Sequence, residues 1–118
     1  MNSQSVFFQS SCLKTLAAVE ADPNVSGQHE FNGTVEMKIL LGSERRTFPA
    51  KFFVRDDNIA DEVNVTWYDS REKDPNRSEF RLYFQTNAVM ALAAAGDNML
   101  IGFDNDNTLN FLLIRSAN

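Results

Sequence analysis

Two polar segments of the chain carry most of the side chains that could recognise another molecule. Each combines Gly, Pro, Asn or Ser residues, which are typical of loops, with several hydrogen-bonding side chains. In residues 22–33 the candidates are Ser26, Gln28, His29, Glu30 and Asn32. In residues 69–81 the candidates are Ser70, Arg71, Lys73, Asn76, Arg77, Ser78, Glu79 and Arg81.

These residue types are the ones that read base pairs in the major groove of DNA. An arginine can donate two hydrogen bonds to guanine, Asn or Gln can pair with adenine in the same way, and Glu can accept from cytosine. Acidic side chains among arginines can also orient the guanidinium groups. His29 is either a donor to a phosphate or base edge, or an exposed loop residue. The pattern is compatible with double-stranded DNA as the partner, but mixed-charge loops are more often plain solvated surface.

A second hypothesis is a metal-dependent nuclease built on Glu36 and Lys38. The two side chains lie two residues apart, on the same face of an expected strand, and Asp22 could complete a metal site with them. The solvated face of that strand explains the pair more simply, so we expect neither a metal nor a catalytic residue here. One His and one Cys are too few for a four-ligand zinc site.

Two further candidates have structural explanations. Asp104 and Asp106 resemble the start of a calcium-binding loop, but its sixth and twelfth positions hold Leu109 and Arg115 where Gly and Glu are needed. A hairpin turn is therefore expected. Cys12 has no neighbouring His or basic cluster, which predicts a buried, unreactive thiol.

The formal net charge of −5 argues against nucleic-acid binding when it is taken alone. The distribution of charge weakens that argument. Acidic residues cluster at 56–62 and 97–106, whereas residues 68–81 hold four acidic and four basic side chains. An acidic protein can still bind DNA if its basic groups converge on one surface.

The length of 118 residues fits a single domain, 1–118, with a core of its own. No apolar run approaches the roughly 20 residues that a membrane span needs. The N-terminus shows no basic region followed by an apolar stretch, so no secretory signal is indicated. A single cysteine excludes an internal disulfide and indicates a reducing compartment, which favours a cytoplasmic location.

The apolar pattern from residue 34 onwards is mostly that of strands. Residues 34–41 alternate apolar and polar side chains, which predicts a half-buried strand. Residues 42–45 then predict a turn, with 46–54 as the return strand. Pro49 within that run indicates a sheet edge or a bulge.

The second half of the chain continues this pattern and adds one helix. Residues 63–68 and 80–84 alternate as strands do, and 99–114 predict a hairpin whose turn holds Asn and Asp. Residues 86–96 predict a helix that begins at Thr86 or Asn87 and ends at a glycine. Six or seven strands with one helix favour a barrel or sandwich.

Several runs of this half resemble a known domain. They are WYDSR at 67–71, RSEFRLYF at 77–84, NAV at 87–89, AGDNMLIG at 95–102 and TLNFLLI at 108–114. Together they resemble the N-terminal effector and DNA-recognition domain of EcoRII-type restriction endonucleases. SGQHE at 26–30 is similar to the first DNA-binding arm of that family. The resemblance implies a mainly β fold, a seven-stranded open DNA-binding pseudobarrel of the plant transcription-factor type with one or two short helices.

The resemblance also implies how DNA would be bound. Two arms, at about 22–33 and 69–81, would clasp the major groove over a short G·C-rich site such as CCWGG, where W is A or T. In the first arm the resemblance assigns contacts to Gln28, His29 and Glu30. In the second it assigns them to Tyr68, Arg71, Arg77, Glu79 and Arg81.

On this interpretation the chain is the target-recognition domain of a type II restriction endonuclease from a bacterial restriction–modification system. The domain itself would be no enzyme and would need no cofactor. Magnesium would serve only a covalently linked nuclease domain that lies outside this chain, and no membrane partner is expected. The alternative is a β-barrel that binds a small ligand or a protein and has no nucleic-acid function.

Overall fold

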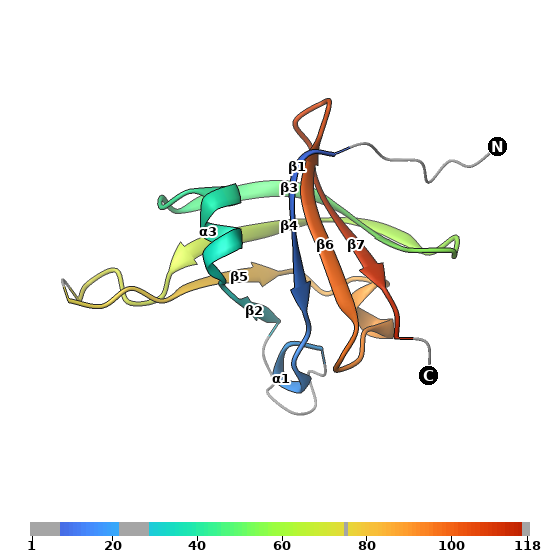
Figure 1. Ribbon diagram of the computed structural model, residues 1–118, viewed down its shortest axis with the longest axis horizontal. Coiled ribbons are helices and arrows are strands. Elements are labelled where there is room, and N and C mark those ends of the chain that lie inside the picture. Colours follow the sequence, from blue (N-terminus) through green and yellow to red (C-terminus); the bar gives the residue numbers. More distant parts are fainter. Residues whose placement is uncertain (1–7, 22–28, 75, 117–118) are drawn as a thin grey trace.

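Seven strands form one curled, open sheet in the computed structural model, which describes residues 8–21, 29–74 and 76–116 (Figure 1). The strands are β1 (Phe8–Thr15), β2 (Glu30–Asn32), β3 (Arg46–Val54), β4 (Ala60–Asp69), β5 (Phe80–Phe84), β6 (Asn98–Asp104) and β7 (Leu109–Ile114). Within these described residues, two short α-helices, α1 (Ala18–Ala21) and α3 (Val35–Leu41), and one 3-10 turn, η1 (Met90–Leu92), accompany the sheet. The expectation of a mainly β, seven-stranded open barrel with short helices is confirmed.

The strand order across the sheet is β1-β6-β7-β3-β4-β5-β2. Neighbours are antiparallel except β3 and β7, which run parallel from the Ala50–Leu109 pair to the Val54–Leu113 pair. The hairpin predicted for 99–114 is confirmed as β6 and β7. Because the sheet curls without closing, β1 and β2 remain as its two edges.

A continuous aromatic and aliphatic core fills the inner face of the sheet. Trp67, Phe31, Phe52 and Phe111 are completely buried, and the rings of Phe52 and Phe111 stack with centroids 4.4 Å apart. Aromatic rings of this size each remove roughly 150–250 Å² from water, so they supply much of the driving force for folding. The inner face is therefore occupied by core packing.

A buried ion pair joins the two edges of the sheet. Lys14, from edge strand β1, lies with its Nζ 2.7 Å from the Oε2 of Glu20. The same oxygen accepts the backbone N–H of Asn32, in edge strand β2, at 2.8 Å, and Oε1 accepts that of Ala17 at 2.8 Å. Both charged side chains are almost fully buried. This edge ion pair (Lys14 and Glu20) connects the open sides of the half-barrel.

The strand predicted for residues 34–41 is wrong, because these residues form the helix α3. The Thr34 hydroxyl accepts the N–H of Met37 at 3.1 Å and caps the helix. Gly42 ends it at φ 90°, a conformation that glycine adopts without strain. Met37 and Leu41, four residues apart, face the core, whereas Val35 and Ile39 are exposed. The alternating pattern of residues 34–41 arises because this helix carries apolar residues on its exposed face as well as on its buried face.

The loss of that strand also changes the environment of β3. Residues 34–41 are helical and cannot form a hairpin with β3. Its antiparallel partner is instead the following strand, β4. Pro49 lies opposite Asn64 of β4, and the pairing with β7 begins only at Ala50. This part of a central strand is therefore bonded on one side only, as the proline requires.

The helix predicted for residues 86–96 is also wrong, because only one 3-10 turn, η1, forms there. The Asn87 side chain accepts the N–H groups of Val89 and Met90 and starts the turn, but Ala93 is already extended. Buried Asp97 then binds the N–H groups of Ala94 and Ser116, at 2.9 and 2.7 Å. Tertiary hydrogen bonds thus prevail over the helix propensity of the alanines.

The turn between β6 and β7 is held by Asp104. Its Oδ1 accepts the N–H groups of Asp106 and Thr108, and its Oδ2 accepts from the Asn110 amide. The carboxylate thus stabilises a hairpin turn, as expected. Cys12 is half-buried, and desolvation, followed by the charge of Glu36, raises the pKa of its thiol.

Candidate binding surface on the outer face

The bases of the two polar segments lie side by side on the outer face of the sheet. β2 pairs with β5 so that Asn32 lies opposite Arg81, and β5 pairs with β4 so that Arg81 lies opposite Tyr68. Side chains alternate between the two faces of a strand, and the intervening Phe31 and Leu82 are buried in the core. The three polar side chains therefore share the face that points away from the core.

Five of the predicted site residues form one hydrogen-bonded network, the Glu79 network: Glu30, Tyr68, Arg71, Glu79 and Arg81. Arg81 donates from Nη1 to Glu30 at 3.3 Å and from Nε to Glu79 at 3.2 Å, and its Nη2 also bonds Glu79. Arg71 donates from Nε to the other oxygen of Glu79 at 3.0 Å, and the Tyr68 hydroxyl donates to Glu30. The network fixes two guanidinium groups in defined orientations.

The network stabilises its own charges. Hydrogen bonds from Arg81 and then from Arg71 hold the pKa of Glu79 below its usual value. The hydrogen bond to Glu79 raises the pKa of Arg81 further. Burial, followed by the hydrogen bond to Glu30, raises the pKa of Tyr68 to about 12. At neutral pH the network therefore presents ionised Glu79 and Arg81 beside a neutral phenol.

The segment that follows β4 is anchored at its base and projects from the sheet. The Asp69 carboxylate accepts the N–H groups of Glu79 and Arg71, at 2.8 and 2.9 Å, and these bonds lower its pKa. Ser70 donates its N–H to the Glu79 carbonyl at 2.8 Å. In Figure 1 this β4–β5 connection extends well beyond the neighbouring strands. A projecting element with a fixed base is what groove readout requires.

The tip of the same connection carries further exposed polar residues. Lys73, Asn76, Arg77 and Ser78 are all exposed. Asp74 orders this stretch by accepting the N–H of Asn76 at 3.0 Å on its side chain and that of Arg77 at 3.3 Å on its backbone carbonyl. The cations at the tip are thus displayed on a turn with local hydrogen bonds.

The first polar segment is described only from residue 29 onwards. Ser26 and Gln28 lie outside the described residues. His29 is half-buried: its ring stacks on Phe84 with centroids 5.6 Å apart, and its Nδ1 lies 3.2 Å from the Thr86 hydroxyl. His29 is therefore a partly accessible residue just before β2, and its role as a donor to DNA stays a prediction.

Sequence reasoning did not assign two cations beside this surface to DNA binding. The Nζ of Lys38, on α3, lies 5.1 Å from the centre of the Phe80 ring, and the guanidinium of Arg45 lies 5.3 Å from that of Tyr68. Both are cation–π contacts. A helix over residues 34–41 places Lys38 one turn after the Thr34 cap. The expected strand did not indicate this position for Lys38.

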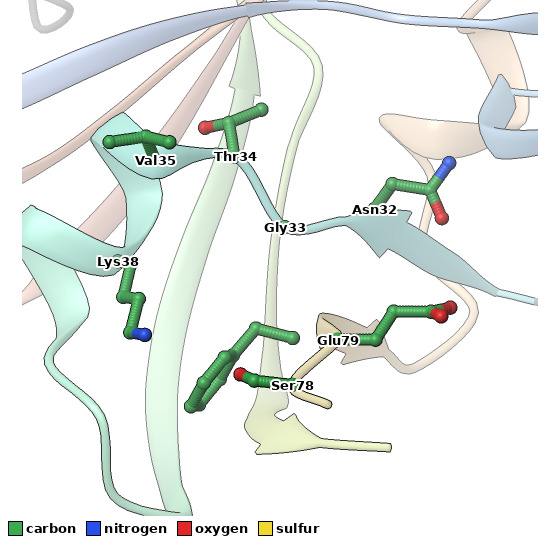
Figure 2. Close-up of a pocket in the computed structure, with 8 residues that line it drawn as sticks. Asn32, Gly33, Thr34, Val35, Lys38, Ser78 and Glu79 are labelled. Carbon is green, nitrogen blue, oxygen red and sulfur yellow. The ribbon is translucent and has the colours of Figure 1, made fainter. Parts of the chain in front are cut away.

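A pocket of about 570 Å³ lies between α3 and the β4–β5 connection (Figure 2). It is lined by Asn32, Gly33, Thr34, Val35, Lys38, Ser78, Glu79 and Phe80. Its walls therefore come from both polar segments and from the helix that the sequence pattern concealed. This pocket is called the Lys38 pocket below.

The metal-nuclease hypothesis loses its geometric basis. On α3, Glu36 and Lys38 are two residues apart and point to nearly opposite sides of the helix, so they share no face. Asp22 lies outside the described residues. Within residues 8–21, 29–74 and 76–116, no three His, Cys, Asp or Glu side chains are grouped to hold a metal ion.

No helix in the described part of the chain is long and apolar enough to cross a membrane.

The fold and this surface define a mainly β half-barrel whose outer face carries an ordered, ion-paired polar network next to a projecting arm. Comparison with known proteins adds no closer definition: no family model, no curated protein and no solved structure matches the chain.

Proposed function

We propose that the chain recognises a short sequence of double-stranded DNA with the outer face of its sheet and the β4–β5 connection. The observation that carries the proposal is the Glu79 network, in which Glu79 binds both Arg71 and Arg81. An arginine whose guanidinium is already oriented loses less conformational entropy when it binds a guanine edge. A carboxylate between two arginines also disfavours bases that present only acceptors at that position.

The resemblance of residues 67–71 and 77–84 to the EcoRII type extends this proposal. The chain would be the target-recognition domain of a bacterial type II restriction endonuclease and would act in the cytoplasm. It would select a G·C-rich site such as CCWGG and need no metal ion for binding. The nuclease reaction would belong to a linked domain and its magnesium.

Selection from a library of random duplexes at low salt tests the proposal. We expect one short motif to be enriched and bound in the nanomolar range, and binding to weaken as salt displaces phosphate contacts. Enrichment of no motif would disprove sequence-specific recognition.

Two substitutions in the second segment test the roles of its arginines. Arg77→Ala and Arg81→Ala are each expected to weaken binding to the selected site by about 1–3 kcal/mol, if each makes two hydrogen bonds to a base. Arg55→Ala is the matched control, because Arg55 is exposed and its ion pair is with neighbouring Asp56. Equal losses on selected and random duplexes would instead assign the two arginines to phosphates.

A β-barrel that binds a protein or small ligand is the competing proposal. Two observations favour it: the net charge of −5 and the exposure of Val35 and Ile39 on α3. Hydrogen exchange distinguishes the two, since DNA should slow exchange in β5 and the β4–β5 connection. Slowing confined to α3 by a protein partner, with no effect of DNA, would support the competitor.

A further inference from the structure

We propose that the Lys38 pocket binds one phosphate group of the DNA backbone, with Lys38 supplying the charge. The inference rests on the proposed function and adds to it a contact that carries no base specificity. Phosphate contacts fix the register of a protein on the duplex, whereas base contacts read the sequence. The pocket and the Glu79 network would divide these two tasks.

The balance of charges around the pocket favours an anion. Glu79 is bonded to Arg81 and Arg71, and Asp69 is bonded to two backbone N–H groups and the Ser78 hydroxyl. Lys38 makes no ion pair within 4.0 Å with any described residue, although its charge helps to lower the pKa of Asp69. The acidic groups are thus already partnered, and one ammonium group is left to attract a ligand.

The ammonium group is also held in place. The contact with the Phe80 ring restricts the flexible lysine stem, and Figure 2 shows Lys38 extending from α3 toward the segment that carries Ser78. A phosphate there would replace part of the hydration of an ammonium group whose position is already set. A lysine restricted in this way loses less side-chain entropy on binding than a free one.

The floor of the pocket requires glycine. At Gly33 the chain approaches β5 so closely that its N–H donates to the Phe80 carbonyl at 2.8 Å. A Cβ at this position would lie 2.5 Å from that oxygen and 2.9 Å from the Trp67 ring. The close approach leaves an opening next to the polar side chain of Asn32, which is exposed on β2.

The pocket adjoins the groups proposed to read bases. Glu79 lines the pocket and also holds Arg81 in the Glu79 network. A phosphate seated near Lys38 would therefore place the groove of the same duplex beside Arg81. One bound phosphate would fix the distance at which the arginines meet the base edges.

The salt dependence of DNA binding tests this inference. Binding of wild type and Lys38→Met to the selected duplex and to a random duplex is measured over a range of salt concentrations. Methionine keeps an apolar stem on Phe80 and removes the charge. We expect the slope of log K against log[salt] to become shallower by about 0.9, the value for one phosphate contact. Affinity for both duplexes should fall by the same factor.

Two variants serve as controls. Lys38→Arg keeps the charge and should keep the wild-type slope. Lys51→Gln removes a charge that acts on Asp104, away from the pocket, and should leave the slope unchanged. Thermal unfolding of each variant confirms that it is folded.

Each contrary outcome has a distinct meaning. An unchanged slope in Lys38→Met, a loss confined to the selected duplex, or an equal change in Lys51→Gln would overturn the phosphate site and leave the proposed function standing. If wild type binds no duplex at all, both proposals fail.

Discussion

Individual side chains of the outer face act through the partners that hold them. Glu79 binds two guanidinium groups at once, and Glu30 accepts from both Arg81 and the Tyr68 hydroxyl. A substitution of Glu79 or Glu30 would therefore also disturb the orientation of the arginine and tyrosine side chains that the carboxylate binds. Alanine substitutions here measure the loss of this arrangement as well as the loss of a contact.

The ionisation of Tyr68 provides a direct test of the network. Burial and the hydrogen bond to Glu30 raise its pKa from 10.0 to about 12. A pKa that is higher in the folded state favours the neutral phenol, so the associated stability is complete below pH 10 and is lost as the pH rises through about 12. We expect the NMR signal of the Tyr68 ring carbon that carries the hydroxyl to stay at its neutral position up to about pH 11.

Two substitutions control that titration. Tyr68→Phe identifies the signal by removing it. Glu30→Gln keeps the acceptor but removes the charge, so it should bring the Tyr68 titration closer to the ordinary tyrosine value. A wild-type titration with its midpoint near pH 10 would contradict the burial and the hydrogen bond to Glu30 that raise this pKa.

Among the elements, the two edge strands depend on a buried ion pair for their connection. Glu20 binds Lys14 of β1 and the backbone of Asn32 in β2. Asn32 directly follows Phe31 in β2, the strand that also carries Glu30 of the Glu79 network. The edge ion pair thus positions part of the proposed binding surface from the opposite side of the half-barrel.

Removal of one member of this pair should destabilise the whole fold. Glu20→Ala leaves the buried Lys14 ammonium group without its counter-charge and removes the acceptor of two backbone N–H groups, so we expect it to lower the free energy of unfolding by about 3–5 kcal/mol. Glu36→Ala, an exposed glutamate on α3, is the control and should change it by less than about 0.5 kcal/mol. Urea unfolding measures both. A cost for Glu20→Ala close to that of the control would show that the pair does not hold the edges together.

The elements also show where sequence patterns are sufficient and where they are not. Strands β4 and β5 follow from alternation, because one face of each packs on the core, and β6 and β7 follow from the apolar runs on either side of a turn of Asn and Asp. Residues 34–41 alternate equally well, but the cap at Thr34 and the glycine at 42 make them helical. In residues 86–96, buried Asp97 redirects a chain whose alanines favour a helix. The hydrogen bond from the Ser116 N–H to Asp97 joins residues 19 positions apart, so it leaves no periodic signal in the sequence.

For the proposed binding surface, the sequence identified candidate residues but not the contacts between them. The polar composition identified Glu30, Arg71, Glu79 and Arg81 as candidates, and the structure brings them together. Their mutual ion pairs depend on the pairing of β2 with β5, which joins residues about fifty positions apart. Because nothing local encodes that pairing, neither the network nor the Lys38 pocket could be derived from spacing.

For the whole molecule, the interior position of β7 in the sheet determines how stability is distributed. β7 is hydrogen-bonded to β6 on one side and to β3 on the other, whereas β2 is bonded to β5 alone. Its residues Phe111 and Leu113 are completely buried. A strand paired on both sides opens only when the sheet is disrupted, while an edge strand can open locally.

Native-state hydrogen exchange measures this difference. We expect the amides of Phe111 and Leu113 to exchange only through global unfolding, with a free energy equal to that from urea unfolding. The amides of β2 should exchange through local openings of lower free energy. Equal protection of β2 and β7 would contradict this distribution and would indicate that the edge ion pair makes β2 as stable as the centre of the sheet.

The placement of β7 also affects how the chain folds during its synthesis. β3 and β4 can pair as soon as both have left the ribosome, but β1 has no partner until β6 has been made. The second edge of β3 has no partner, and the Phe52 ring lacks the Phe111 ring that stacks on it, until residues 109–114 are translated. One edge of β3 therefore stays unpaired while the roughly 55 residues between β3 and β7 are made, and it is exposed to aggregation and to chaperones during that interval. Proteolysis of stalled chains of increasing length should find β3 protected only after β7 has emerged.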